Sequence, residues 1–296
     1  MSSALRLSEL GELGLLRELE RRGLAQRIAD DGAVLDGGRV ATQDVLVEGV
    51  HFRREWTSWR DLGYKAAAVN LSDLAAMAAE PEALLVTLAA PAETEADDVL
   101  ELYEGLNEPG VSLVGGDTSV APVLTLGVTA LGRSERMPGR GGARLGDALV
   151  VTGPLGGSAA GLRVLELGLP GFDELVQMHN RPPIRTDAGR RLGPVAHALM
   201  DLSDGIASDA ARIAERSGCK LVIEVERLPL APRLGEVGDE PFWALGEDYE
   251  LLAALPPEDA EASGFSIVGR CEEGAGAELL LDGRTFEVEG WSHFRR

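Results

Sequence analysis

The segment Ala66–Ala79 has the apolar composition of a buried helix, yet it contains one ionisable residue, Asp73. A carboxylate that is buried without a partner destabilises a fold by several kcal/mol. Asn70 lies three residues earlier and therefore on the same face of the predicted helix. The fold must consequently bring a cation or a hydrogen-bond donor to Asp73, and this requirement constrains the structure more than any other feature of the sequence.

The elements around this helix predict an α+β fold. A chain of 296 residues is long enough for two ordinary domains. The first unit is expected to contain a helix within the first thirty residues, a hairpin of Ala33–Leu35 and Arg39–Val50, a helix from Ser58 that Pro81 stops, a strand at Leu84–Leu88, a helix at Thr94–Asn107, and strands at Val111–Val114 and Leu124–Leu131. This order predicts a mixed sheet with its helices on one face.

A segment rich in Gly, Arg and Pro, between Gly132 and Gly146, is interpreted as a linker. It divides the chain into an N-terminal domain, residues 1–135, and a C-terminal domain, residues 136–296, which we expect to be a sandwich-like α/β domain. The elements predicted for the second domain are a strand at Ala148–Val151, a turn at Gly153–Gly157, helices ending at Leu167, near Thr186–Leu199 and at Ile206–Ser217, strands at Leu221–Val225, Tyr249–Ala254 and Phe265–Val268, and a hairpin at Leu279–Val288 turning at Asp282-Gly283.

The charge of the chain argues against two classes of partner. There are 49 Asp and Glu residues against 28 Lys and Arg residues, a formal charge of -21. This charge repels nucleic acids and anionic membranes, so neither is expected as a partner. The sequence shows no signal peptide and no run of roughly 18 uncharged apolar residues, so we expect a cytoplasmic protein.

Several common nucleotide and metal sites are also excluded. The chain has two lysines, Lys65 and Lys220, and neither ends a Gly-rich loop of the Walker type. No GxGxxG fingerprint and no HExxH pair occurs. The two cysteines, Cys219 and Cys271, lack the pair spacing of a zinc site and are expected to be buried thiols.

Aspartates recur at the ends of predicted strands and at the starts of predicted helices. A single aspartate in such a position is usually a helix cap or a turn residue. Several together can converge at one edge of a sheet, where oxygen ligands without paired Cys or His favour Mg²⁺, and several Mg²⁺ ions favour a phosphate-rich substrate. The groups are Asp30-Asp31, Asp44, Asp73, Asp117 after Gly115-Gly116, and Asp201 with Asp204. The Gly-rich stretch Gly153–Gly161 could also approach a phosphate or be only a tight corner.

Taken together, these motifs closely resemble those of the thiamine-monophosphate kinase family, whose superfamily includes aminoimidazole ribonucleotide synthetase and selenophosphate synthetase. They occur in the family order and span nearly the whole chain. The matching strings are Asp30–Leu35, Thr42–Phe52, Gly63–Met77, Gly115–Thr118, Asp201–Gly205 and Gly246–Leu251. The resemblance implies two α+β domains and a homodimer in which the N-terminal sheets of two protomers join into a barrel.

The resemblance also implies Mg²⁺, in several ions, as the cofactor and ATP as the co-substrate. The residues that match magnesium ligands are Asp31, Asp44, Asp73, Asp117, Asp201 and Asp204, with Thr42 and Gln43 adjoining them. Those that match ATP contacts are Tyr103, near the adenine, Gly116, Asp117, Arg140 and Ser203. Those that match the thiamine monophosphate site are His51, Glu247 and Trp291. The implied catalytic residues among them are Asp44, Asp73, Asp117 and Arg140.

Three positions depart from the family pattern. Family members usually carry Gly where this chain has Ala29 and Ala78, and Ser or Thr where it has Gln43. The two alanines restrict the backbone only modestly if their φ angles are negative. Gln43 alters the metal ligands if the family uses a side-chain hydroxyl there and leaves them unchanged if it uses a backbone carbonyl.

The hypothesis that follows is direct transfer of the γ-phosphoryl group of ATP to the phosphate of thiamine monophosphate. One alternative is another ATPase of the superfamily, although selenophosphate synthetase needs a reactive Cys near the N-terminus and the first cysteine here is Cys219. The other alternative is a non-catalytic, acidic metal-binding protein, which would bind Mg²⁺ without consuming ATP.

Overall fold

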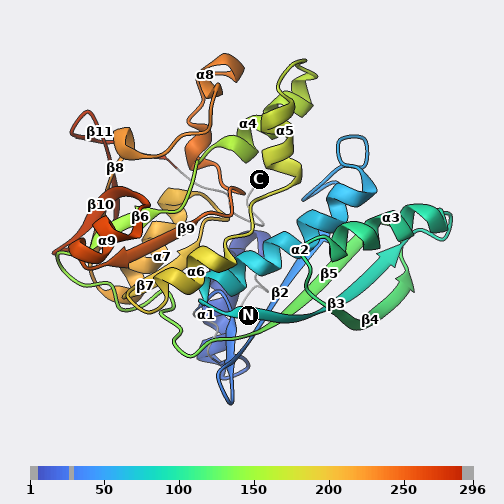
Figure 1. Ribbon diagram of the computed structural model, residues 1–296, viewed down its shortest axis with the longest axis horizontal. Helices are drawn as coiled ribbons and strands as arrows, with labels where there is room; N and C mark the ends of the chain where they lie inside the picture. Colours follow the sequence, from blue (N-terminus) through green and yellow to red (C-terminus); the bar gives the residue numbers. More distant parts are fainter. Residues whose placement is uncertain (1–5, 27–29, 289–296) are drawn as a thin grey trace, which may run out of the picture.

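The computed structural model describes residues 6–26 and 30–288, which form two α+β units (Figure 1). The first contains a five-stranded sheet in the order β1-β2-β5-β3-β4. Strands β3 and β4 pair in parallel, and the other neighbours are antiparallel. The elements of this unit are α1 (Leu7–Arg21), β1 (Ala33–Leu35), β2 (Arg39–Val47), α2 (Trp59–Ala76), β3 (Glu80–Ala90), α3 (Ala96–Asn107), β4 (Leu113–Val120) and β5 (Thr125–Arg133).

Helix α2 packs on one face of this sheet and is buried along most of its length. Its first turn is capped by Ser58, whose Oγ accepts a hydrogen bond from the backbone N–H of Asp61 at 3.0 Å. A glycine allows α3 to approach closely, because a Cβ on Gly63 would lie 1.9 Å from the carbonyl oxygen of Leu102. The small residues of α2 thus let it pack against both the sheet and α3, which lies beside it on the same face (Figure 1).

The opposite face of the N-terminal sheet is partly exposed. On β5, Leu126 and Val128 point toward α2 and are buried, whereas Thr129 points to the other side. On β2, Val45 is 50 % exposed on that same side. We call this side the open face; its residues are Ala41, Gln43, Val45, Leu85, Thr87, Ala89, Gly115, Asp117, Ser119, Gly127, Thr129 and Leu131.

The second unit is a seven-stranded sheet in the order β12-β11-β8-β10-β6-β9-β7, with helices on both faces. Leu149 of β6 packs with α7 on one face, and Val150 packs with α6 and α9 on the other. This arrangement confirms the sandwich-like α/β prediction. The elements are β6 (Ala148–Val151), α4 (Gly157–Leu167), α5 (Asp173–Asn180), α6 (Thr186–Leu192), β7 (Ala198–Asp201), α7 (Ile206–Ser217), β8 (Lys220–Glu224), η1 (Val225–Arg227), α8 (Leu234–Val237), η2 (Phe242–Ala244), β9 (Leu251–Leu255), α9 (Pro257–Ser263), β10 (Ser266–Glu272), β11 (Gly276–Leu281) and β12 (Arg284–Thr285).

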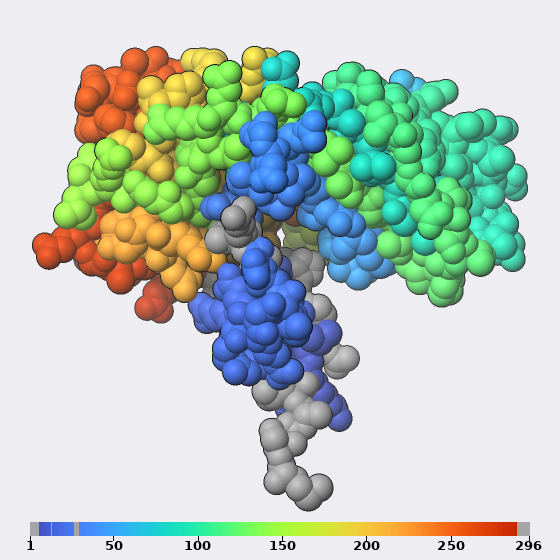
Figure 2. All heavy atoms as spheres, turned by 90° about the horizontal axis from the view of Figure 1, so that it is seen from below, coloured from blue at the N-terminus to red at the C-terminus, as the bar shows by residue number. Residues whose placement is uncertain are grey.

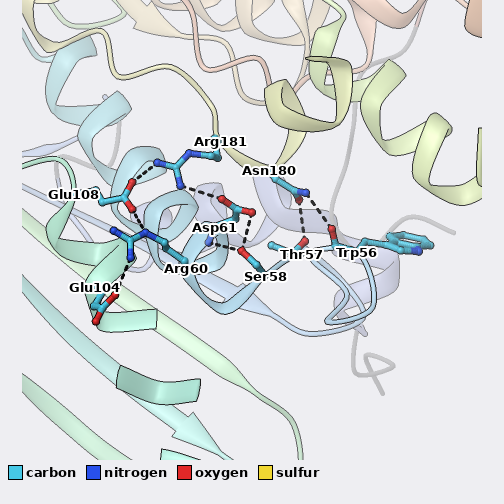
Figure 3. A network of polar contacts seen from close by, with 9 residues as sticks. All are labelled: Trp56, Thr57, Ser58, Arg60, Asp61, Glu104, Glu108, Asn180 and Arg181. Carbon is cyan, nitrogen blue, oxygen red and sulfur yellow. Dashed lines mark hydrogen bonds and ion pairs between the residues drawn. The ribbon is translucent and has the colours of Figure 1, made fainter. Parts of the chain in front are cut away.

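Helices α4, α5 and α8 lie together at one side of the second unit and share a small core of their own (Figure 1). We call these three helices the cap. The end of α5 is tied to the first unit by a polar network (Figure 3). Arg181 binds Glu108 and, at 3.0 Å, Asp61, while the side-chain oxygen of Asn180 accepts a hydrogen bond from Thr57 Oγ1 at 2.9 Å. The cap therefore has a defined position relative to α2 and α3.

Helix α1 belongs to the N-terminal segment that projects from the body in Figure 2, where it is blue. It contacts the second unit through Arg17, which pairs with Glu215 of α7 at 3.1 Å. Among the helices of the described residues, none combines the length and the apolarity that a membrane crossing requires.

Most of the predicted elements are confirmed. The helix at Ile206–Ser217 has the expected bounds, and Asp282-Gly283 joins β11 to β12 as a two-residue turn, with Leu281 paired to Arg284. Both turn residues have positive φ angles, as a type I′ turn requires.

Other local predictions were wrong. Gly115–Asp117 do not follow a strand but lie inside β4, which is an edge strand and continues to Val120. The helix near Thr186–Leu199 ends at Leu192, because Gly193 and Pro194 interrupt it before β7. The helix from Ser58 ends at Ala76, and Pro81 lies within β3.

The backbone of Ala78 does not have the negative φ angle under which an alanine would replace the family glycine with little strain. Its φ angle is +50°, in the left-handed region that favours glycine. Ala78 is therefore a strained replacement for the usual family glycine at the turn that ends α2. Ala29 lies outside the described residues.

Candidate active site

A cavity of about 1120 Å³ opens between the two units and is bounded on one side by the cap. The N-terminal unit contributes Asp31, Asp44 and Asp73 to its wall, and the C-terminal unit contributes Asp201 and Asp204. Aspartates that are far apart in the sequence thus line one cavity.

Three of these aspartates form a tight cluster. One carboxylate oxygen from each of Asp31, Asp73 and Asp201 lies within 4.8 Å of the others. Burial raises the pKa of Asp201 to about 7, with a further contribution from Asp31, and burial followed by Asp31 and Asp204 raises the pKa of Asp44 to about 6. Burial and the neighbouring carboxylates likewise raise the pKa of Asp73 well above its usual value. Close, buried like charges of this kind are stabilised by a bound cation.

Helix α2 holds the strands on either side of Asp73 in place. Ser72 Oγ donates a hydrogen bond to Asp201 Oδ2 at 2.8 Å, which fixes the end of β7. The side-chain oxygen of Asn70 accepts a hydrogen bond from the backbone N–H of Asp44 at 3.1 Å, which fixes β2. Thr42 Oγ1 adds a bond to the carbonyl of Asn70 at 3.3 Å. The polar residues of this apolar helix therefore assemble the cluster around Asp73.

Arg140 is a cation beside the cluster. Its Nε donates to Asp31 Oδ1 at 3.1 Å, its guanidinium forms an ion pair with the same carboxylate, and its charge lowers the pKa of Asp73. Burial by itself would lower the pKa of Arg140, but Asp31 more than offsets this and raises it. The backbone N–H of Arg140 donates to Asp30 Oδ1 at 2.8 Å, so the segment that we interpreted as a linker contributes to the site.

The cluster has the properties of a magnesium site. Within the described residues, Asp31 Oδ2 is buried and has no hydrogen-bond partner. A buried acceptor without a donor is unusual and is explained by a cation that coordinates it. The donors are carboxylate oxygens, which Mg²⁺ prefers over the nitrogen and sulfur ligands of zinc. The residues present therefore fit Mg²⁺, and Asp31, Asp73 and Asp201 are the residues that would hold it.

Asp204 and Ser203 lie at the edge of this cluster. Asp204 forms an ion pair with Arg212, and its backbone N–H donates to Asp209 Oδ2 at 3.1 Å. The carbonyl of Ser203 accepts a hydrogen bond from the backbone N–H of Glu247 at 2.8 Å. The loop after β7 is thus joined to the loop that precedes β9.

His51 and Glu247 also line the cavity. His51 Nδ1 accepts a hydrogen bond from the backbone N–H of Val47 at 3.0 Å, which orients the imidazole after β2. Glu247 and Tyr249 have φ angles of +59° and +51°, which are uncommon for residues with a Cβ. Such strain is retained mainly where a side chain must take a specific position in a site.

Several residues that the resemblance implicates lie outside this cluster of aspartates. Gly116 and Asp117 are exposed on the edge strand β4, and Tyr103 of α3 borders a separate hollow with Arg60 and Leu100. Thr42 is buried, and its side chain bonds to α2. Gln43 is exposed on the open face and reaches the rim of the cavity. Trp291 lies outside the described residues.

The Gly-rich turn before α4 is occupied by the protein itself. Gly156 N–H donates to Asp248 Oδ2 at 2.7 Å, and Ser158 N–H donates to Asp248 Oδ1 at 3.2 Å. The buried carboxylate of Asp248 therefore caps the start of α4 in the place where a phosphate would bind. This observation supports the interpretation of Gly153–Gly157 as a tight corner.

Comparison with known proteins agrees with this geometry. Residues 29–134 match the family model "AIR synthase related protein, N-terminal domain", and residues 144–276 match the C-terminal domain of the same description. A thiamine-monophosphate kinase from Aquifex aeolicus is 37% identical over 98% of this chain and 100% of its own length. The chain belongs to the thiamine-monophosphate kinase family. The Salmonella typhimurium member is 38% identical over 90% of this chain and 91% of its own length.

Solved structures of the family have the same fold. A structure described as "AaThiL complexed with AMPPCP and TMP" matches with a TM-score of 0.91 at 37% identity and covers 99% of this chain and 100% of that chain. The hydrogenase maturation protein HypE from E. coli matches with a TM-score of 0.72 at 21% identity, which shows a shared fold only.

One residue of the site was not found from the sequence. Lys65 is fully buried, and its Nζ lies 3.2 Å from Glu247 Oε2. Its position inside the predicted apolar helix, in a chain with only one other lysine, Lys220, was a signal that could have identified it.

Proposed function

We propose that this chain transfers the γ-phosphoryl group of ATP to the phosphate of thiamine monophosphate and thereby forms thiamine diphosphate and ADP. The observation that carries this proposal is the cluster of Asp31, Asp73 and Asp201 beside Arg140, in a chain whose family members are named for this reaction. A related structure is described as a complex with AMPPCP and TMP.

The reaction needs charge neutralisation more than it needs a base. The attacking phosphate has a second pKa of about 6 and is largely dianionic at neutral pH. Two polyanions must approach each other, and bound Mg²⁺ ions would neutralise their oxygens and draw them together. Asp31, Asp73 and Asp201 would hold these ions, with Asp44 and Asp204 as further ligands at the rim. Arg140 would place an additional positive charge beside the transferred group.

We also propose that the functional unit is a homodimer that joins through the open face of the N-terminal sheet. Apolar side chains such as Val45 of β2 and Leu131 of β5 lie on that face, and the edge strand β4 belongs to the same sheet. Apolar side chains exposed together on one face of a sheet commonly mark a protein interface. Gly116 and Asp117 of a second copy would then be the residues that complete the nucleotide side of each site.

The direct test is a coupled assay of ADP release with and without thiamine monophosphate and Mg²⁺. ADP should form only when both are present. ATP hydrolysis that does not depend on thiamine monophosphate would favour another ATPase of the superfamily. Magnesium binding without any ADP release would favour the non-catalytic alternative.

A further inference from the structure

The face of α2 that carries Asp73 into the cavity also carries a buried cation. Lys65 is 1 % exposed, and its Nζ lies 3.2 Å from Glu247 Oε2. Lys65, Val69 and Asp73 are separated by four residues each and share one face of the helix. With a helical rise of about 1.5 Å per residue, Lys65 and Asp73 are about 12 Å apart along the axis. One helix thus contributes Asp73 to the cavity wall and contacts, through Lys65, Glu247, which also lines the cavity.

Glu247 is held from several directions while one part of its side chain stays accessible. Lys65 contacts it from α2, His179 Nδ1 lies 3.6 Å from Oε2, and its backbone N–H donates to the carbonyl of Ser203. The side chain nevertheless remains 30 % exposed on the cavity wall. The carboxylate is therefore fixed in direction and available to a ligand.

The charges around Glu247 favour its ionised form. Burial alone would raise the pKa of Glu247, but the ammonium of Lys65 more than offsets this and lowers it. Burial, followed by Lys65, lowers the pKa of His179 to about 3, so the imidazole is neutral. Ser158 Oγ lies 3.1 Å from His179 Nδ1 and further fixes the ring. Glu247 is therefore an ionised carboxylate whose Oε2 is paired with Lys65.

We propose that Lys65 is a positioning residue for the organic end of the substrate, because it holds Glu247 as an oriented carboxylate for a cationic, amino-bearing heterocycle. The inference rests on the function proposed above. Aromatic side chains, Phe52, Trp56 and Phe242, line the same cavity and suit a planar ring. The phosphate end then extends toward Asp73. Helix α2 sets the separation between the two regions that bind the ends of the substrate.

The test compares steady-state kinetics of the native chain, Lys65→Met and Lys220→Met. Methionine matches the length of lysine without its charge, and Lys220 pairs with Glu278 at a site far from the cavity. For Lys65→Met, the KM for thiamine monophosphate should rise by about 10- to 100-fold, as expected for loss of a charge-assisted contact. The kcat and the KM for ATP should change by less than about 3-fold. Lys220→Met should leave all three parameters at their native values.

A double-mutant cycle separates positioning from a general effect on the fold. Glu247→Gln should raise the KM for thiamine monophosphate by a similar factor, and adding Lys65→Met to it should change that KM by less than about 3-fold. The proposal would be overturned if the two substitutions raised the KM for thiamine monophosphate independently, so that their factors multiply. It would also be overturned if Lys65→Met changed the KM for thiamine monophosphate and the KM for ATP equally. Melting temperatures show whether each variant is folded. If Lys65→Met does not fold, Glu247→Gln provides the test, and an unchanged KM for thiamine monophosphate in that variant would overturn the proposal.

Failure of the proposed function has a different signature. It would appear in the native chain as absence of ADP formation that depends on thiamine monophosphate. The inference about Lys65 fails only when the native chain is active and the variants do not show the selective change in KM.

Discussion

If Asp117 takes part in catalysis, it must do so from a second copy of the chain. Asp44 of β2, Val128 of β5, Val86 of β3 and Gly116 of β4 lie in one row across the sheet. Three strand spacings of about 4.8 Å separate Asp44 from Gly116 by about 14 Å. Asp117 also points to the open face, whereas Asp44 points toward α2. Ligands of one Mg²⁺ ion, each about 2.1 Å from it, cannot span this distance.

Complementation between two inactive variants tests this conclusion. Asp73→Asn and Asp117→Asn should each abolish turnover when prepared alone. In a mixed dimer, one site contains both substitutions and the other contains neither, if the two residues come from different protomers. Random pairing of equal amounts then makes half of the dimers mixed, and the preparation should regain about one quarter of the native activity.

The assay is ADP release after the two variants are denatured together and refolded, with each variant refolded alone as the control. No recovery in the mixture, together with native-like dimers by sedimentation, would refute the reasoning, because it would place both aspartates in the same protomer's site. Full activity of Asp117→Asn alone would remove this residue from catalysis altogether.

Three further substitutions probe the cavity and the packing. Asp73→Asn should reduce kcat to background yet raise the melting temperature without Mg²⁺, since it removes one of several buried like charges; a lower melting temperature would contradict this. Burial raises the pKa of Asp248 to about 7. Between about pH 4 and pH 7 the folded state therefore keeps a proton on Asp248 that the unfolded state has released. The contribution of Asp248 to the free energy of unfolding consequently falls as the pH rises through this range. Relative to the native chain, Asp248→Asn should therefore gain up to about 4 kcal/mol in free energy of unfolding between about pH 4 and pH 7, measured by urea denaturation, whereas a constant difference would refute the assignment. Gly63→Ala should lower the free energy of unfolding by about 3 kcal/mol or more, because its Cβ would lie 1.9 Å from the carbonyl oxygen of Leu102, while Gly235→Ala, with open space around it, should have little effect.

The sequence predicted the elements whose local chemistry is decisive. Ser58 begins α2 as an N-cap, and Asp282-Gly283 forms a hairpin turn that few other residue pairs adopt. Boundaries that depend on neighbouring strands were less predictable. Gly115–Asp117 has the composition of a loop, but pairing with β3 keeps it extended, and this pairing is a long-range interaction that no local pattern reveals.

The site was predictable to a similar extent. The requirement that a donor or cation meet the carboxylate in the apolar helix directed attention to the surroundings of Asp73. There the charge of Arg140 opposes the rise in the pKa of Asp73, whereas Ser72 bonds to Asp201 instead. Lys65 was missed because a lone lysine at the edge of an alanine-rich segment is typically exposed. Its burial follows from Glu247, which is 182 residues away in the sequence and approaches only when the two units are assembled.

The charge of the cavity bears on how many ions the site needs. The aspartate end is lined by Asp30, Asp31, Asp44, Asp73, Asp201 and Asp204, but only by Arg140 and Arg212 as cations. When all are ionised, these groups carry an excess of four negative charges, which two divalent ions would neutralise before any phosphate enters. Because the pKa values of Asp44 and Asp201 are raised, binding of these ions would also displace protons near neutral pH. By contrast, Lys65 already neutralises Glu247 at the other end. The two ends of one cavity would thus use different cations, mobile ions for the phosphates and a fixed lysine for the organic group.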